Sequence, residues 1–169
     1  MKKKILLLTL VCMMTLVLLT GCGTSNASEK TEPFRVGLEA LYPPFNWTQM
    51  DSSNGAVKID GSKEYAGGYD VEIAKRIAEG LGKKLVIVKI EWDGLVPALT
   101  SGKIDAIIAG MSPTAKRKET IDFSDNYYKS DLVMVVKKDG AYEKADSLND
   151  FKGAKITAQL NTFHYTVID

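Results

Sequence analysis

Side chains that bind metal ions or act as nucleophiles are scarce in this chain, which has two cysteines and one histidine among 169 residues. Cys12 lies within an apolar N-terminal run and Cys22 closely follows that run, so the rest of the chain has no thiol. This lack excludes a disulfide framework, a thiolate metal site and a cysteine nucleophile from the body of the protein. A single histidine, His164, without a cysteine partner predicts no metal site. We expect no cofactor.

A charge excess of either sign is also missing. The chain has 22 lysines and arginines against 21 aspartates and glutamates. Residues 1–21 hold three of the lysines and no acid, so the remainder has 19 basic and 21 acidic residues, a net charge of −2. Such a body offers no basic stripe for nucleic acid and no polybasic patch for a membrane surface.

An N-terminal secretory signal is predicted by three features in order. Lysines at positions 2–4 precede an apolar stretch at residues 5–19, and small residues stand directly before Cys22. The stretch is shorter than the roughly 20 residues that a membrane-spanning helix needs. The order resembles the lipobox of bacterial lipoproteins, in which the cysteine becomes the lipidated first residue. We expect a lipoprotein signal peptide at residues 1–21 and a lipid on Cys22 that anchors the protein outside the bacterial cell membrane. A plain signal peptide or an uncleaved anchor is the alternative.

Composition then divides the remainder into a tether and a folded body. Residues 22–32 are small and polar without periodicity, which is typical of a flexible tether. Residues 33–169 suffice for one modest core but are few for two complete domains. A polar, glycine-rich stretch at residues 50–67 predicts an exposed loop or a hairpin.

Strands and helices alternate along the first part of this body. Residues 34–40, which place Phe34, Val36 and Leu38 at alternate positions, and the apolar runs at residues 85–88 and 107–109 predict three strands. Apolar residues at helical spacing predict a helix in each gap, one capped by Asp70 and the other by Asp93. Strand, helix, strand, helix, strand is the order of an α/β fold with a parallel sheet and flanking helices.

A candidate binding site follows from this topology, because ligands of parallel sheets lie beyond the carboxyl ends of the strands. Residues 39–45, Trp92 and residues 110–117 all stand at those ends. In the last segment Ser112 is a good N-cap, and Arg117 follows about one turn later. Free amides, a hydroxyl and a guanidinium at one strand end form a carboxylate receptor. The alternative is an ordinary strand-to-helix turn with a surface arginine.

The C-terminal part has a different pattern. Residues 132–136 and 154–158 predict strands, and residues 147–153 predict a short capped helix between them. Residues 159–162 predict the start of another helix, and Asp169 follows roughly two turns later without a stop signal. We therefore expect a chain that is truncated.

Several segments together resemble the extracellular solute-binding proteins of family 3 in bacteria. These segments are residues 68–78, 92–99, 102–106, 110–117, 121–124 and 148–162. The resemblance implies a type II periplasmic-binding-protein-like fold with two α/β lobes, lobe 1 at residues 33–130 and an incomplete lobe 2 at residues 131–169. It also implies a role without chemical change, as the extracytoplasmic binding component of an ABC importer for a polar or basic amino acid. An ABC permease and an ATPase would be its partners.

The resemblance further implies which residues contact the amino acid. They are Glu39, Tyr42, Trp92, Gly110, Ser112, Arg117, Gln159 and Thr162. Arg117 would grip the ligand carboxylate, Gly110 and Ser112 would face its ammonium group, and the two aromatic rings would enclose its side chain. Glu39 would meet the polar end of that side chain, and the last two residues would belong to the second lobe.

Other interpretations of the same residues stay open. Tyr42 and Trp92 alone would suit rim packing, Glu39 a solvated charge, and Thr162 an N-cap. Asn161 stands where many relatives have glycine, which would reshape the turn. A small-acid dehydratase-like enzyme on the same fold, or a non-functional truncated fragment, are the alternative functions. Arginine, lysine, glutamine and cystine all remain candidate ligands.

Overall fold

The computed structural model describes residues 31–168. These residues, apart from Thr31, belong to the second of two units, Glu32–Asp169. The predicted signal peptide and the predicted lipidation site, Cys22, lie outside the described residues.

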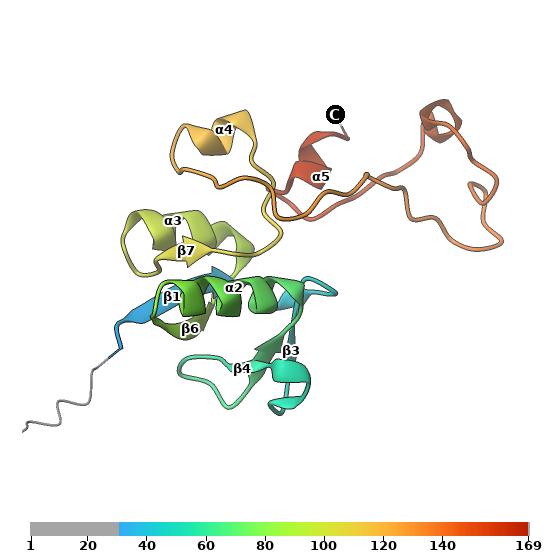
Figure 1. Ribbon diagram of the computed structural model, residues 1–169. Coiled ribbons are helices and arrows are strands. Elements are labelled where there is room, and N and C mark those ends of the chain that lie inside the picture. Colours follow the sequence, from blue (N-terminus) through green and yellow to red (C-terminus); the bar gives the residue numbers. More distant parts are fainter. Residues whose placement is uncertain (1–30, 169) are drawn as a thin grey trace, which may run out of the picture. The chain divides into compact units, whose positions relative to one another are not determined.

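A three-stranded parallel sheet is the centre of the fold (Figure 1). Strand β1 (Pro33–Leu38) lies between β6 (Lys84–Lys89) and β7 (Ala106–Ile107), and both neighbours run parallel to it. Helix α2 (Tyr69–Gly80) precedes β6, and α3 (Leu95–Thr100) connects β6 to β7. The predicted α/β class, with its parallel sheet and flanking helices, is confirmed.

A second sheet, of four short antiparallel strands, packs beside the first. Its strand order is β2-β3-β5-β4. The strands are β2 (Leu41–Tyr42), β3 (Asn46–Gln49), β4 (Val57–Lys58) and β5 (Tyr65–Gly67), with a 3-10 turn, η2 (Ser53–Gly55), between β3 and β4. The predicted hairpin at residues 50–67 is the β4–β5 pair, in which Val57 lies opposite Ala66. Strands of two to four residues are too short to produce a periodic sequence pattern, so the rest of this sheet was not predicted.

The hydrophobic core lies on the parallel sheet and under its helices. Its fully buried apolar side chains include Val36, Leu38, Val71, Ile87, Leu95 and Ile104. Two small residues of α2, Ala74 and Ala78, are buried as well, which lets this helix approach the sheet closely.

Both predicted aspartate caps are wrong. Gly68 occupies the N-cap position of α2, and Asp70 lies inside the first turn with its side chain buried. Helix α3 follows a 3-10 turn, η3 (Trp92–Gly94), so Gly94 precedes it and Asp93 makes no cap hydrogen bond. Both carboxylates accept hydrogen bonds from residues distant in sequence instead, and local sequence rules cannot anticipate such partners.

The C-terminal part, orange to red in Figure 1, contains short helices joined by long loops. The predicted capped helix is confirmed as η4 (Leu148–Phe151), with a capping box between Ser147 and Asp150. The predicted helix start is confirmed as α5 (Phe163–Thr166). The strands predicted at residues 132–136 and 154–158 are wrong, since no strand is assigned there. A β-rich segment forms a strand only beside another strand, and in this part of the described chain none is available.

Candidate functional site

The segments that follow the three parallel strands meet at one edge of the sheet. Glu39 follows β1, Trp92 follows β6, and residues 110–117 follow β7. The guanidinium carbon of Arg117 lies 5.3 Å from the centre of the Trp92 ring, within the range of a cation–π contact. The Tyr42 ring lies against Gly110, where an added Cβ would come within 3.1 Å of it. Segments far apart in sequence therefore meet as the topology predicted.

Arg117 is held in place by the turn that precedes its helix. That helix, α4 (Ala115–Lys118), is capped by Thr114, whose hydroxyl accepts a hydrogen bond from the Arg117 backbone at 3.3 Å. The predicted N-cap at Ser112 is wrong, because the helix begins two residues later than the Ser-Pro pair suggests. Ser112 contributes its carbonyl oxygen, which accepts from Arg117 Nη1 at 2.9 Å. A four-residue helix has little dipole, so the guanidinium is the anion-binding group here.

Partial burial makes this guanidinium a strong donor. Burial lowers the pKa of Arg117 from its ordinary value, yet an arginine stays protonated in proteins. A charged donor partly removed from water gains more from each carbonyl or carboxylate partner than an exposed donor does. The position therefore suits recognition of a carboxylate.

Asn161 supplies the second partner of Arg117. Its carbonyl oxygen accepts from Arg117 Nη2 at 2.9 Å and from the indole nitrogen of Trp92 at 3.1 Å. Its side chain donates to the Asp93 carboxylate at 3.0 Å. Asn161 has φ of 61°, the left-handed conformation that glycine and asparagine adopt most readily. Asparagine thus keeps the backbone conformation that glycine would favour and adds a side-chain hydrogen bond.

The two remaining C-terminal residues behave differently from each other. Gln159 Nε2 donates to both carboxylate oxygens of Glu39, at 3.1 and 3.3 Å. Thr162 is buried and caps α5, where its hydroxyl accepts from the Tyr165 backbone and donates to the Gln159 carbonyl. The N-cap interpretation of Thr162 is therefore the one that the structure displays.

A buried hydrogen-bond network beneath this edge was missed by the sequence analysis. The Asp70 carboxylate accepts from Asn46 Nδ2 at 2.7 Å and from the Tyr127 hydroxyl at 2.8 Å. Burial raises the pKa of Asp70, and the hydrogen bonds from Asn46 and Tyr127 oppose that rise. Burial, together with the negative charge of Asp70, also raises the pKa of Tyr127. Asn46 and Tyr127 lie 24 and 57 residues from Asp70, so no local sequence motif predicts these hydrogen bonds.

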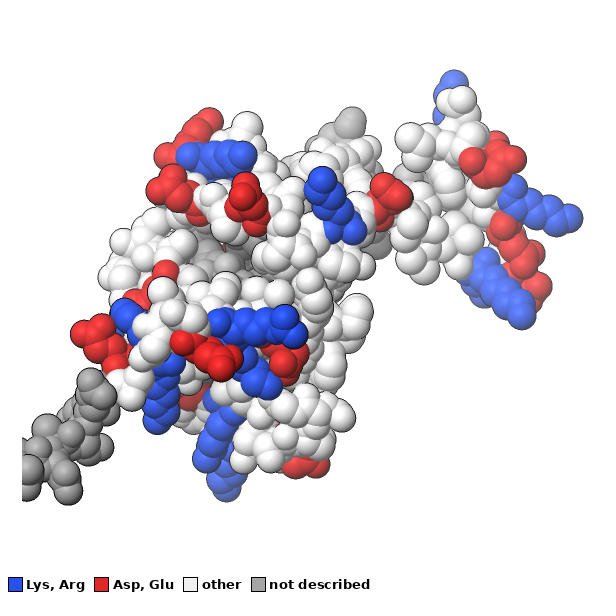
Figure 2. Space-filling model, in the orientation of Figure 1, with Lys and Arg blue, Asp and Glu red and all other residues white. Residues whose placement is uncertain are grey.

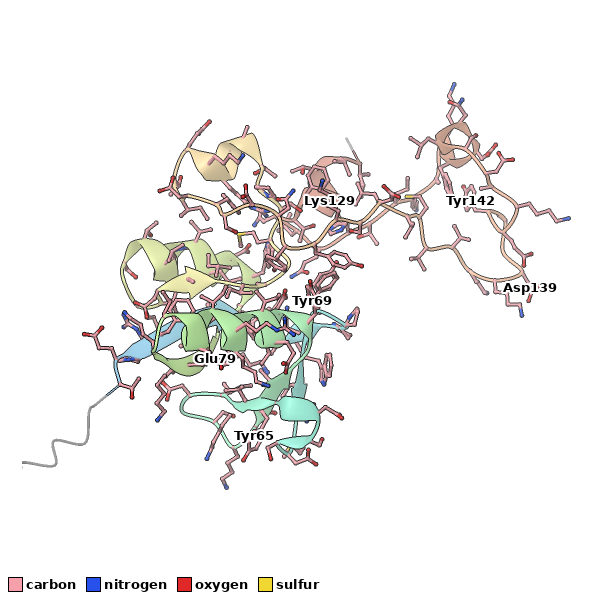
Figure 3. All side chains as sticks on the ribbon, in the orientation of Figure 1. Tyr65, Tyr69, Glu79, Lys129, Asp139 and Tyr142 are labelled. Carbon is pink, nitrogen blue, oxygen red and sulfur yellow. The ribbon has the colours of Figure 1, made fainter. Side chains whose placement is uncertain are left out.

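Aromatic rings line a cavity of about 570 Å³ next to this network. Phe45 stacks on Tyr42 at 5.1 Å and meets Tyr128 edge-on at 5.0 Å. Figure 3 shows Tyr69 at the start of α2, near the segment that carries Lys129, and its hydroxyl donates to the Tyr127 carbonyl at 3.1 Å. Of the eight predicted site residues, Tyr42, Gly110 and Ser112 line the cavity.

The other five predicted residues lie outside this cavity lining. Among them, Arg117 and Trp92 share the Asn161 carbonyl, and Glu39 is bonded to Gln159. The structure thus brings the predicted residues together in two neighbouring groups, and the segment at residues 159–161 covers the second group. Figure 2 shows basic and acidic residues interspersed over the face in view.

Comparison with known proteins identifies the family. The model of the bacterial extracellular solute-binding proteins, family 3, matches residues 34–162. The chain belongs to this family. The family predicted from the sequence is therefore confirmed, and membership places the protein outside the cytoplasm.

Several curated relatives of this solute-binding protein are named for the amino acid they bind. The arginine-binding extracellular protein ArtP of Bacillus subtilis is 34% identical, over 96% of this chain and 57% of its own length. The L-arginine-binding protein of Pseudomonas aeruginosa is 35% identical, over 73% of this chain and 42% of its own. A solved ancestral arginine-binding protein bound to arginine is 40% identical, over 59% of this chain and 38% of its own, with a TM-score of 0.47. The chain spans about half the length of the curated relatives it matches.

Two features are absent from the described part of this solute-binding protein, a cluster of metal ligands and a helix that could cross a membrane. Among residues 31–168, no group of three histidine, cysteine, aspartate or glutamate side chains is arranged to hold a metal ion. Within the same residues, no helix is long and apolar enough to cross a membrane.

Proposed function

We propose that this protein is the extracytoplasmic binding component of an ABC importer, and that it binds a cationic amino acid without changing it chemically. A permease and an ATPase would be its partners. The observation that carries the proposal is the placement of Arg117 and Glu39 beyond the ends of two adjacent parallel strands, β7 and β1. An amino acid with a basic side chain presents the matching charges, a carboxylate and a distant cation.

Arg117 is suited to the carboxylate end of such a ligand. Its guanidinium donates from two nitrogens, one to the Ser112 carbonyl and one to the Asn161 carbonyl. A ligand carboxylate carries a full negative charge and two oxygens, so it is a stronger acceptor than the carbonyl of Asn161. Exchange of that carbonyl for the ligand would leave Arg117 in its present position.

Glu39 is suited to the other end. Its two oxygens already accept from one amide nitrogen of Gln159, a contact that resembles the one an amide or guanidinium side chain of a ligand would make. A guanidinium offers several donors and a positive charge, so it satisfies a carboxylate better than a neutral amide does. The Trp92 ring, which already faces one guanidinium, offers a flat surface for such a side chain.

The relatives are named for several amino acids, of which arginine and histidine have basic side chains and glutamine and cystine do not. Two of the relatives are named for arginine. The proposal includes a lipid on Cys22 as the membrane anchor, because the residues before it have the order of a lipoprotein signal.

Calorimetric titration of the chain with arginine, lysine, glutamine and alanine tests this function. We expect saturable binding that is tightest for arginine or lysine. Glu39→Gln should weaken binding of the two cationic ligands about tenfold and that of glutamine much less, because only the cations lose an ionic partner. Glu91→Gln is the matched control, since it removes an exposed carboxylate next to Trp92.

Two results would contradict the proposal. One is the absence of saturable heat with every amino acid. The other is turnover of a small carboxylic acid, detected as product by chromatography, which would favour the dehydratase-like alternative.

A further inference from the structure

Asp70 is a fully buried carboxylate whose hydrogen-bond donors lie outside its own helix. It is 0% exposed and lies in the first turn of α2. A buried carboxylate needs donors, and each oxygen of Asp70 has one: Asn46 at Oδ2 and Tyr127 at Oδ1. Both donors belong to other segments of the chain, so Asp70 connects three parts of the structure.

Each donor continues the chain of hydrogen bonds to the backbone at the edge of the parallel sheet. The Asn46 side-chain oxygen accepts from the Ala40 backbone at 2.8 Å, and Ala40 directly follows Glu39. The Tyr127 hydroxyl accepts from the Gly110 backbone at 3.1 Å. One uninterrupted series of hydrogen bonds therefore runs from the end of β1 through Asp70 to the end of β7.

The two ends of this series share an uncommon backbone conformation. Ala40 has φ of 58° and Gly110 has φ of 59°, both in the left-handed region. This conformation is costly for alanine, so it persists only where the surroundings hold it. The bond from Ala40 to Asn46 is the holding contact at one end, and the bond from Gly110 to Tyr127 is the holding contact at the other.

The bond at Gly110 also determines what this residue can offer a ligand. Its N–H is already used by Tyr127, so only its carbonyl remains for a molecule in the site. A carbonyl accepts hydrogen bonds, which suits an ammonium group and not a carboxylate. The network thus leaves a hydrogen-bond acceptor, and not a donor, for the ligand at Gly110.

We propose that Asp70 and Tyr127 are positioning residues of the amino-acid site: through Asn46 and Gly110 they hold the ends of β1 and β7 in the conformation that receives the ligand's ammonium group and side chain. This inference rests on the proposed function and goes beyond it. Neither residue touches the ligand itself.

Tyr127→Phe tests the inference with a change of one hydroxyl. The ring stays in place beside Tyr69, 6.1 Å away, while the bonds to Gly110 and Asp70 are lost. Tyr128→Phe is the matched control, because Tyr128 packs on Phe45 in the same cluster, is 53% exposed, and its hydroxyl has no hydrogen-bond partner among the described residues. Asp70→Asn is a second variant, which keeps the side-chain shape but replaces one acceptor oxygen by a donor.

Two measurements separate positioning from simple loss of stability. The first is calorimetric affinity for arginine and for 5-guanidinopentanoic acid, which is arginine without its ammonium group. We expect Tyr127→Phe to weaken arginine binding about tenfold and to change the affinity for the analogue by less than about threefold, since the affected carbonyl serves the ammonium group. The second is amide hydrogen exchange by NMR without ligand, in which the Gly110 amide should exchange faster in Tyr127→Phe than in Tyr128→Phe.

The outcomes distinguish this inference from the proposed function. Unchanged exchange at Gly110, or equal loss of affinity for arginine and the analogue, would overturn the positioning role. Faster exchange at Gly110 in a protein that binds no amino acid would support the hydrogen-bond role and overturn the proposed function. If Asp70→Asn does not fold, Tyr127→Phe alone decides.

Discussion

Replacement of Arg117 by alanine should weaken amino-acid binding by roughly 150-fold. In the structure the guanidinium donates two hydrogen bonds of 2.9 Å and lies over the Trp92 ring. A hydrogen bond to a charged group is worth about 1.5–3 kcal/mol. Because Arg117 is only half-buried, the lower value applies to each of the two bonds that a ligand carboxylate would accept. Their sum, about 3 kcal/mol, corresponds to that factor in Kd.

Arg117→Lys separates the charge from the shape of the donor. A lysine keeps the positive charge but lacks the planar fork, so it should recover about half of the lost binding free energy. Lys116→Ala is the control, because this neighbour in α4 is exposed and its removal should leave Kd unchanged.

Calorimetry with arginine measures the affinities, and circular dichroism checks that each variant melts as the unmodified protein does. Equal Kd values for the unmodified protein, Arg117→Ala and Lys116→Ala would refute the reasoning and leave Arg117 as a surface residue. A loss as large in Arg117→Lys as in Arg117→Ala would instead mean that the geometry of the fork carries all of the effect.

Three further predictions concern anchoring, acid stability and association. Cys22→Ala should release the protein from membranes or leave it unprocessed, and mass spectrometry that finds an unlipidated N-terminus elsewhere would count against the anchor. Arg35 lowers the pKa of Asp105 through a side-chain hydrogen bond, so the stability from this pair exists above the ordinary aspartate pKa of about 4 and is lost as pH falls through the lowered value. Urea unfolding between about pH 5 and pH 2 should therefore show a steeper loss of stability for the unmodified protein than for Asp105→Asn, and parallel curves would exclude this contribution. Val133 and Val135 are 78% and 93% exposed, so the chain should self-associate, and lysine at both positions should shift it toward monomer in light scattering.

The parallel sheet was predictable because local patterns specify each of its elements. Strand β1 places Phe34, Val36 and Leu38 at alternate positions, β6 has an apolar run between Lys84 and Lys89, and α2 has buried side chains at helical spacing. Gly82 follows the last turn of α2 and has φ of 62°, the left-handed conformation that commonly ends a helix. Its position directly after the periodic apolar segment predicted this helix end. Topology then follows from the order of elements, since a strand–helix–strand unit forms parallel strands.

The elements that were predicted wrongly are those at which two local signals competed or a strand lacked a partner. Ser112 and Thr114 are both good caps two residues apart, and the structure uses Thr114, whose hydroxyl accepts from Arg117. Asp70 has the residue type of a cap, but a buried position with two distant donors stabilises it inside the first turn. The segment at residues 132–136 has high strand propensity, yet propensity does not supply the neighbouring strand that its backbone needs.

The sequence by itself determined the fold class and the edge of the sheet at which the site residues gather, because these depend on periodicity and on the order of the elements. The family followed from the resemblance of several ordered segments to known proteins. Only the tertiary structure decided which side chains are partners. Gln159 meets Glu39 across 120 residues of chain, and Tyr127 meets Asp70 across 57. Such contacts arise where the folded backbone places two side chains within about 3 Å, and no local pattern encodes that distance.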